Sequence, residues 1–322
     1  MNCKEIFEKI ITNTQTYLEE NKLQAMILGI SGGIDSTLTA AICHEIENRT
    51  NDKIQFYGVS LPCSTNSDEE NNSALKCMKA FCKPGRYWVE NLQKEYSLMF
   101  STCSVHGDCT QIGKGNIKAR LRMIYLYDLA QKNHGIVMDT DNLTEHYLGF
   151  FTIHGDVADF NPIGGLWKHE IYELVNWLRD YYNKFTKYVS PDSFDSKDEI
   201  ETRNEYAKKV IALSYALNIT PTDGNGVKAG GDMAQIAPGH TYNDVDDILE
   251  TYLTYIKYYK PCLDFDVKIT PEIQLCLDKI KYLNDKYGEE TVNMVLERYR
   301  RSEFKRKKLP IVVDRDIYKE YI

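Results

Sequence analysis

A short loop rich in glycine and serine follows the first strongly apolar segment of the chain. Residues 25–30 read Ala-Met-Ile-Leu-Gly-Ile, a run of strand length, and residues 31–36 continue as Ser-Gly-Gly-Ile-Asp-Ser. A loop of this kind between a strand and a helix exposes backbone N–H groups and the positive end of a helix dipole. Gly29 to Ser36 are therefore predicted to bind phosphate, although they lack the Walker A lysine and the Gly-x-Gly-x-x-Gly spacing.

Asp35 adds a carboxylate to this predicted phosphate site. A carboxylate and a phosphate repel each other, so their proximity requires a cation between them, and Mg²⁺ accepts such a shell of hard oxygen ligands. The alternative is purely structural: the loop would be a tight turn, and Asp35 would only cap the helix that follows.

The elements that must position this loop alternate along the first half of the chain. Apolar runs predict strands at 25–30, 54–60, 87–89 and 135–139, and the patterns between them predict helices at 5–21, 36–47, 68–81 and 115–132. This alternation is typical of an α/β fold with an open parallel sheet and helices on both faces. In such sheets ligands bind beyond the carboxyl ends of the strands, where Gly29–Ser36 and the segment 139–145 both fall.

The second half of the sequence predicts a helical C-terminal part. Helical patterns occur at 167–182, 197–216, 243–259, 271–286 and 289–305. Five glycines fall between residues 224 and 239, which predicts a mobile glycine-rich loop at about 223–239. We find no internal repeat and no low-complexity tract, and we expect a single domain over residues 1–322.

Composition excludes several classes of function. The chain is 43% hydrophobic and 27% charged, close to globular averages, so a packed core is expected. Its net charge of −8 disfavours general DNA or RNA binding, which usually needs a basic excess. The nine cysteines form no Cys-x-x-Cys pair, and no leader or long apolar run occurs. These features predict a cytoplasmic protein with reduced thiols, no zinc site and no membrane segment.

The loop Ser31-Gly32-Gly33-Ile34-Asp35-Ser36 resembles the pyrophosphate loop of the N-type ATP pyrophosphatases, a group that includes NAD, GMP and asparagine synthetases. Further blocks resemble the ammonia-dependent NAD synthetases, in the family's order and over about residues 25 to 315. They are residues 115–123, 139–145, 149–152, 159–168, 221–222, 239–247 and 305–310. The resemblance implies an adenine nucleotide alpha hydrolase-like fold and an amide-forming ligase that uses ATP.

The same resemblance implies a role for individual residues. The catalytic residues would be Asp35, Glu145 and Lys168, of which Asp35 and Glu145 would bind Mg²⁺. ATP would be bound by Gly29, Ile30, Ser31, Gly32, Gly33, Ile34, Asp35, Ser36, Thr140, Lys168 and Thr222. Deamido-NAD would be bound by Arg120, Asp159, Phe304 and Lys305.

Simpler interpretations of two of these residues stay open at this point. Arg120 and Arg122 could form the solvated face of a helix, and Glu145 could cap the short helix expected after Thr140.

The chain departs from the family pattern mainly at residues expected near deamido-NAD, the substrate that accepts the amide nitrogen. Ile153 stands where a substrate-binding lysine is expected, and the stretch 156–159 is one residue shorter than in the bacterial form. Phe304 replaces a histidine and Gln235 a glutamate, whereas the residues for ATP and metal are kept. We expect a weaker hold on deamido-NAD, partly compensated by His154. Residues at about 183–215 are expected to be an insertion.

The resemblance also implies a reaction and partners. The nicotinate carboxylate of deamido-NAD would attack the α-phosphorus of ATP, releasing pyrophosphate, and ammonia would then displace AMP. Only residues 1–24 precede the first predicted strand, so we expect no N-terminal glutaminase domain and a supply of free ammonia or a separate glutaminase partner. Family members are homodimers in which the segment after Gly149 reaches the partner's substrate, so a homodimer is expected.

Two other functions remain open from the sequence. The chain could be another N-type ATP pyrophosphatase that adenylates a different acceptor. It could also be a catalytically silent module that binds ATP or a dinucleotide, with Ile153, Phe304 and Gln235 as signs of decay.

Overall fold

The computed structural model describes residues 1–63, 67–186, 197–220, 233–257 and 270–307, without the side chains of His106 and Gln235. The four described strands, all parallel, form one sheet in the order β3-β2-β1-β4. They are β1 (Ala25–Gly29), β2 (Gln55–Ser60), β3 (Tyr87–Val89) and β4 (Gly135–Val137). This confirms the predicted α/β fold with an open parallel sheet.

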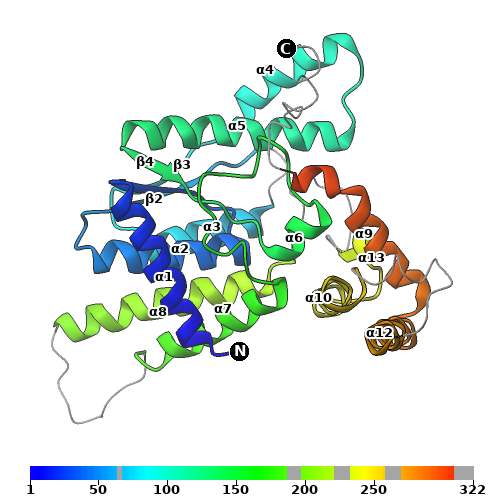
Figure 1. Cartoon of the computed structure of the whole chain (residues 1–322). Coiled ribbons are helices and arrows are strands. Elements are labelled where there is room, and N and C mark those ends of the chain that lie inside the picture. The colour runs from blue at the N-terminus through cyan, green and yellow to red at the C-terminus, as the bar shows by residue number, and fades with distance from the viewer. Residues whose placement is uncertain (64–66, 187–196, 221–232, 258–269, 308–322) are drawn as a thin grey trace, which may run out of the picture.

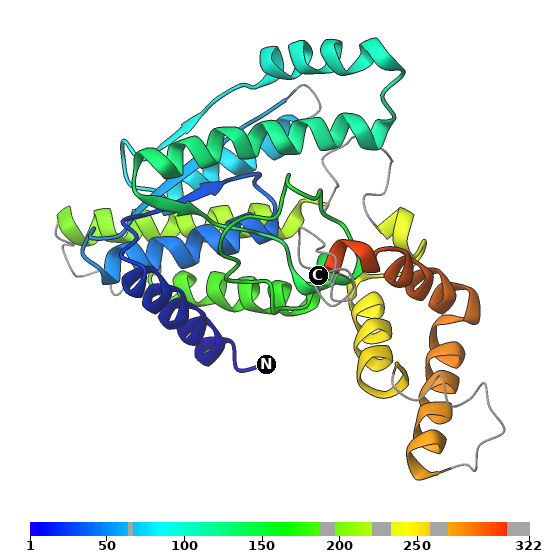
Figure 2. The ribbon, with the colours of Figure 1, turned by 45° about the horizontal axis from the view of Figure 1, so that its top comes forward.

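Helices cover both faces of this sheet (Figure 1). On one face lie α1 (Cys3–Glu20), α2 (Ile34–Arg49), α3 (Asp68–Phe81), α7 (Lys168–Asn183) and α8 (Lys197–Asn218). The other face is covered by α4 (Gln93–Cys103) and α5 (Gln111–Lys132), which lie side by side in both ribbon views (Figure 2).

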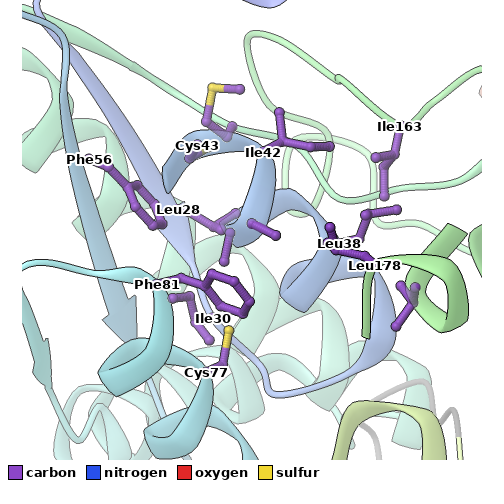
Figure 3. Packing of buried hydrophobic residues seen from close by; sticks show 14 of the residues in the cluster. Leu28, Ile30, Leu38, Ile42, Cys43, Phe56, Cys77, Phe81, Ile163 and Leu178 are labelled. Atoms are coloured by element: carbon purple, nitrogen blue, oxygen red, sulfur yellow. The ribbon is translucent and has the colours of Figure 1, made fainter. Parts of the chain in front are cut away.

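Strand β1 is a continuous apolar run because helices cover both faces of the sheet. Alternate side chains of a strand point to opposite faces, so Met26 and Leu28 pack toward α2 and α3 while Ile27 packs toward α5. All three are fully buried. Figure 3 shows Leu28 near Phe56, Ile42 and other side chains of the larger cluster.

The order of the strands creates a crevice next to β1. The chain moves from β1 to β2 and β3 on one side and later adds β4 on the other. Because β1 and β4 are parallel neighbours, the loops that follow them leave the same edge of the sheet, at the carboxyl ends of the strands, which is where ligands bind in open α/β sheets. Both segments singled out in the sequence, Gly29–Ser36 and 139–145, lie at this point.

A second apolar cluster forms a helical unit beside the sheet. It contains α6 (Leu143–Leu148), α9 (Met233–Ile236), α10 (Tyr242–Thr251), α12 (Pro271–Tyr287) and α13 (Glu289–Arg301), with a short π-helix at Tyr252–Ile256 and a 3-10 turn at Glu303–Arg306. A further 3-10 turn, Ser104–His106, lies between α4 and α5. Figure 2 shows α12 and α13 extending away from the sheet. The predicted helical C-terminal part is thereby confirmed for the described residues.

Several boundaries differ from the sequence prediction. Helix α4 was not predicted, and α5 begins at Gln111 rather than near Gly115, because the Thr110 hydroxyl accepts the Gly113 N–H at 3.0 Å and starts the helix. Of the loop predicted at 223–239, residues up to 232 lie outside the described part, whereas Met233–Ile236 form one helical turn.

The predicted insertion at 183–215 contains most of α8. This helix packs against α7, α3 and α2, and the two residues after it, Ile219 and Thr220, line the cavity described below. In the described part of the chain, every helix is too short or too polar to cross a membrane.

Candidate active site

The loop after β1 packs closely against α3. Gly32 has a φ of +87°, and a side chain there would bring a Cβ within 2.5 Å of the Ala74 nitrogen on α3. The Ser73 hydroxyl donates to the Gly32 carbonyl at 2.7 Å. Ser31 and Ser36 lie 3.0 Å apart between their hydroxyl oxygens. These contacts fix the backbone that precedes α2, as a preorganised phosphate loop requires.

Three charged side chains from three different elements meet in front of this loop. Lys168 Nζ lies 2.6 Å from Asp35 Oδ2 and 3.0 Å from Glu145 Oε1. Asp35 is the second residue of α2, Glu145 lies in α6, and Lys168 is the first residue of α7. The structure thus brings together the three residues predicted to be catalytic, although they are far apart in sequence.

The position of Glu145 follows from the local structure of α6. Asn142 and Glu145 form a capping box, in which the Glu145 N–H donates to Asn142 Oδ1 at 3.0 Å and Glu145 Oε2 accepts the Asn142 N–H at 3.2 Å. The Asn142 side chain also donates to Asp35 Oδ1 at 3.0 Å. Glu145 therefore caps the helix with one oxygen, as the capping interpretation predicted, and contacts Lys168 with the other. Its role in metal binding stays a prediction.

Burial and mutual contact shift the pKa values of Glu145 and Lys168. Burial raises the pKa of Glu145 to about 7, although Lys168 opposes the shift. Burial alone would lower the pKa of Lys168, but the two carboxylates hold it well above its usual value. The Lys168 side chain is only 1% exposed, so its charge is compensated by Asp35 and Glu145 rather than by water.

A second pair of acids lies at the end of β4. Burial and the neighbouring Asp139 carboxylate raise the pKa of Asp141 well above its usual value. Asp139 itself accepts the N–H groups of Asp141 and Ala158 at 2.7 and 2.8 Å, which fixes the loop after the strand.

The loop and the charged cluster line a cavity of about 260 Å³ beyond the ends of β1, β2 and β4. Of the residues predicted to bind ATP, Gly29, Ile30, Ser31, Gly33, Ile34, Asp35, Thr140 and Lys168 line it. Thr222 lies outside the described residues.

The cavity also includes residues that the sequence analysis did not assign. Arg122 lies on α5 and donates to the Leu61 carbonyl at 3.0 Å, and Glu70 and Asn71 come from the first turn of α3. The capping signal at Ser67 and Glu70 could have indicated that this helix end faces the loop, because Ser73 and Ala74 of the same helix contact Gly32.

The residues predicted to bind deamido-NAD lie outside this cavity. The Arg120 guanidinium donates to the Ile153 carbonyl at 3.2 Å. Asp159 accepts the Tyr127 hydroxyl and the Val137 N–H, each at 3.0 Å. Lys305 donates to the carbonyls of Gly149 and Phe151 at 2.7 and 2.5 Å, and Phe304 is exposed.

Arg120 and Lys305 both donate to backbone carbonyls of the loop 149–153. Arg120 and Lys305 hold the loop that follows α6 from opposite ends, at Ile153 and at Gly149. Within it, Ile153 is half-buried, and His154 is exposed with a φ of +57°. The departure from the family pattern therefore lies in a loop that is anchored through its backbone.

A family model of NAD synthase matches residues 6–198 of the chain. Among curated proteins, the NH3-dependent NAD+ synthetase of Campylobacter jejuni subsp. doylei is 32% identical over 65% of this chain and 81% of its own length. The protein of the same name from Lactobacillus johnsonii is 30% identical over 77% of this chain and 79% of its own. That of Wolinella succinogenes is 27% identical over 96% of each chain.

Two solved structures share the fold of this chain. An NMN synthetase from Francisella tularensis aligns with a TM-score of 0.66 over 98% of this chain and 99% of its own, at 21% identity. An NH3-dependent NAD synthetase from Campylobacter jejuni aligns with a TM-score of 0.61 over 98% of this chain and all of its own, also at 21% identity.

Proposed function

The chain belongs to the NAD synthase family, and we propose that it is an ammonia-dependent NAD synthetase, a ligase that forms NAD from deamido-NAD and ammonia with ATP as co-substrate. The observation that carries the proposal is the meeting of Lys168, Asp35 and Glu145 in front of the loop Gly29–Ser36. A phosphate loop with a buried cation and two carboxylates suits a reaction at a nucleoside triphosphate.

The donor set of the cluster fits Mg²⁺. Carboxylate oxygens of Asp35 and Glu145 converge on one cation, the Lys168 ammonium. Mg²⁺ is commonly bound by one or two carboxylates together with substrate phosphates, so we propose that these two residues hold it when ATP is present. When bound, the ion neutralises phosphate charge.

The residues of this chain then position and neutralise the reacting groups. The N–H groups of the loop and the N-terminus of α2 bind phosphate oxygens, and Lys168 stabilises the charge that develops as the nicotinate carboxylate attacks the α-phosphorus. Pyrophosphate leaves, and ammonia displaces AMP from the acyl-adenylate. The protein needs no covalent nucleophile for either step.

The residues that bind deamido-NAD are proposed from the family resemblance and, for Arg120 and Lys305, from their positive charge. Arg120 and Lys305 are cationic groups at the loop after α6, and deamido-NAD is an anionic dinucleotide that Arg binds well. We propose that these two residues, with Asp159 and Phe304, contact it. Ile153 offers only apolar contact in the same loop, which supports a weaker hold than a lysine would give.

We also propose that the protein acts in the cytoplasm as a homodimer that uses free ammonia or ammonia from a separate glutaminase. Exposed apolar side chains on α4, α5 and the turn between them support an interface there. They are Leu98, Met99, Val105, Ile112, Ile124 and Tyr127. Burial of such a surface against a second copy would contribute favourable free energy.

A charge on this surface should separate the dimer. We expect the native chain of 37.2 kDa to behave as a dimer in light scattering, and the double variant Leu98→Glu/Ile124→Glu as a monomer. Both side chains are more than 60% exposed, so the fold should be retained. Ile211→Glu, at an exposed isoleucine of α8, is the matched control and should stay dimeric. A fully active native monomer would contradict the dimer.

The proposed function is tested by incubating the protein with deamido-NAD, ATP, Mg²⁺ and ammonium and detecting NAD by mass spectrometry. NAD should form in proportion to AMP and pyrophosphate. Nicotinate mononucleotide and other nicotinate acids belong in the same assay, because efficient amidation of one of them instead would establish a different acceptor. Binding of ATP with no pyrophosphate release from any acid would indicate a silent nucleotide-binding module.

A further inference from the structure

The carboxylate of Asp246 on α10 is fully buried where the C-terminal helical unit meets the cavity. Helix α10 contacts both α6 and α7 at this junction, and all three lie near one another in Figure 1. Asp246 does not line the cavity itself. An ionised carboxylate in such a place is costly unless hydrogen bonds satisfy it, so its partners indicate its role.

In the described part of the chain, the hydrogen-bond partners of Asp246 lie on α6 and α7, the helices that carry Glu145 and Lys168. Oδ1 accepts the Thr144 hydroxyl at 2.5 Å. Oδ2 accepts the backbone N–H of His169 at 2.9 Å and its ring Nδ1 at 3.0 Å, which makes Nδ1 the protonated nitrogen. The hydrogen bond from His169 to Asp246 raises the pKa of this histidine.

These partners are immediate neighbours of the reactive side chains. Thr144 precedes Glu145 in α6, and His169 follows Lys168 in α7. The Thr144 hydroxyl oxygen also accepts the backbone N–H of Lys168 at 2.9 Å. One carboxylate thus ties the first turn of α7 to α6. It accepts the backbone N–H of His169, and Thr144 accepts that of Lys168, two donors that the start of a helix leaves without partners.

Other residues of α10 pack this helix into the apolar core of the helical unit. Helix α10 is held there by Val245, Ile248 and Leu249, which belong to the apolar cluster. The neighbouring Asp247 binds inside the unit, where it accepts the Tyr287 and Tyr282 hydroxyls at 2.6 and 2.9 Å. Two adjacent aspartates of one helix therefore serve two different purposes.

We propose that Asp246 is a positioning residue for the reaction. Through its hydrogen bonds to Thr144 and His169, it keeps the Lys168 ammonium between Asp35 and Glu145. The inference rests on the proposed function, since it assigns a role at the same site. A displacement of about 1 Å at a reacting group can reduce a rate about 100-fold, so the register of α7 against α6 matters for turnover.

Asp246→Asn tests this assignment with little change in volume. The amide can no longer accept hydrogen bonds at both ends, so the Thr144 hydroxyl or the His169 donors lose a partner. We expect kcat to fall by about 10- to 100-fold with a smaller change in the KM for ATP, because the reacting groups move while the phosphate loop stays in place.

The matched control is Asp247→Asn, the same substitution one residue further along α10. Apart from Thr251 of α10 itself, its hydrogen-bond partners lie on α12, so kcat should stay within about twofold of the native value. Thr144→Val removes the hydroxyl that donates to Asp246, so it should lower kcat as Asp246→Asn does. The double variant should be no worse than the poorer single one, since both changes break the same connection.

Hydrogen exchange separates this inference from the proposed function. Asp246→Asn should speed amide exchange in peptides that cover 142–149 and 167–175, and Asp247→Asn should not. If the native protein forms no NAD, the exchange result still decides whether Asp246 holds the two helices. Native kcat in Asp246→Asn, additive losses in the double variant, or unchanged exchange in both peptides would overturn the assignment. If Asp246→Asn does not fold, Thr144→Val alone carries the kinetic and exchange tests.

Discussion

Asp35→Asn is expected to lower the rate of NAD formation by at least about 10³-fold, since a divalent cation at the phosphates contributes several kcal/mol. The substitution keeps the shape of the side chain and its place at the start of α2, but it removes one of the two carboxylates that we propose as ligands for Mg²⁺. It also takes away one of the two carboxylates that hold Lys168. Steady-state kinetics at saturating Mg²⁺ would measure the loss.

A matched control and a binding measurement make this prediction specific. Glu69 is the second residue of α3, as Asp35 is of α2, and it is exposed and does not line the cavity. Glu69→Gln should leave the rate nearly unchanged. Calorimetric titration with Mg²⁺ and ATP should show weakened metal binding for Asp35→Asn and for Glu145→Gln. Near-native turnover in either of these two variants would remove that residue from the metal site.

Lys168→Met should lower kcat by about 10²–10³-fold, the usual effect of removing one group that stabilises developing charge. The loss should appear mainly in kcat, because the loop N–H groups still bind the phosphates. Methionine fills a similar volume, so the space between α2, α6 and α7 stays occupied. Single-turnover measurement of pyrophosphate release would locate the defect in the adenylation step.

The same variant should also be less stable in the absence of metal. It leaves two carboxylates close together without their cation, at a cost of about 1–3 kcal/mol. Glu145 can relieve part of this by taking up a proton, because burial already raises its pKa to about 7. Mg²⁺ should restore more stability to Lys168→Met than to the native protein in thermal unfolding.

Lys209→Met is the control for Lys168→Met. Lys209 lies on α8 and stacks over the rings of Tyr182 and Tyr206, away from the cavity. Its replacement should change neither kcat nor the response to Mg²⁺. An equal effect of the two substitutions on turnover would show that Lys168 acts through the fold alone.

The sheet and the helices that cover it could be predicted because their signals are local. Strand β3 at Tyr87–Val89 and helix α3 at Asp68–Phe81 were predicted with the bounds that the structure gives. Helix α4 was missed because it buries no residue fully, so its sequence has no clear apolar face to detect. The two glycines at 113 and 115 delayed the predicted start of α5, since glycine weakens the helical pattern.

The residues of the charged cluster could be identified from the sequence, whereas their contacts could not. Asp35, Glu145 and Lys168 were identified through the resemblance, yet their meeting within 3.0 Å depends on how α2, α6 and α7 pack. The role inferred for Asp246 had no sequence signal beyond its place in a family block, because its partners are about 77 and 102 residues away. Long-range pairing of this kind comes from tertiary packing rather than from local pattern.

The most direct test of the account follows an isotope through the reaction. Deamido-NAD labelled with ¹⁸O in both oxygens of its nicotinate carboxylate is incubated with the protein, ATP, Mg²⁺ and ammonium, and the products are analysed by mass spectrometry. If the carboxylate attacks the α-phosphorus and ammonia then displaces AMP, each AMP carries one ¹⁸O, each NAD retains one, and pyrophosphate carries none. ADP with labelled inorganic phosphate, or NAD formed beside unlabelled AMP, would contradict the proposed reaction.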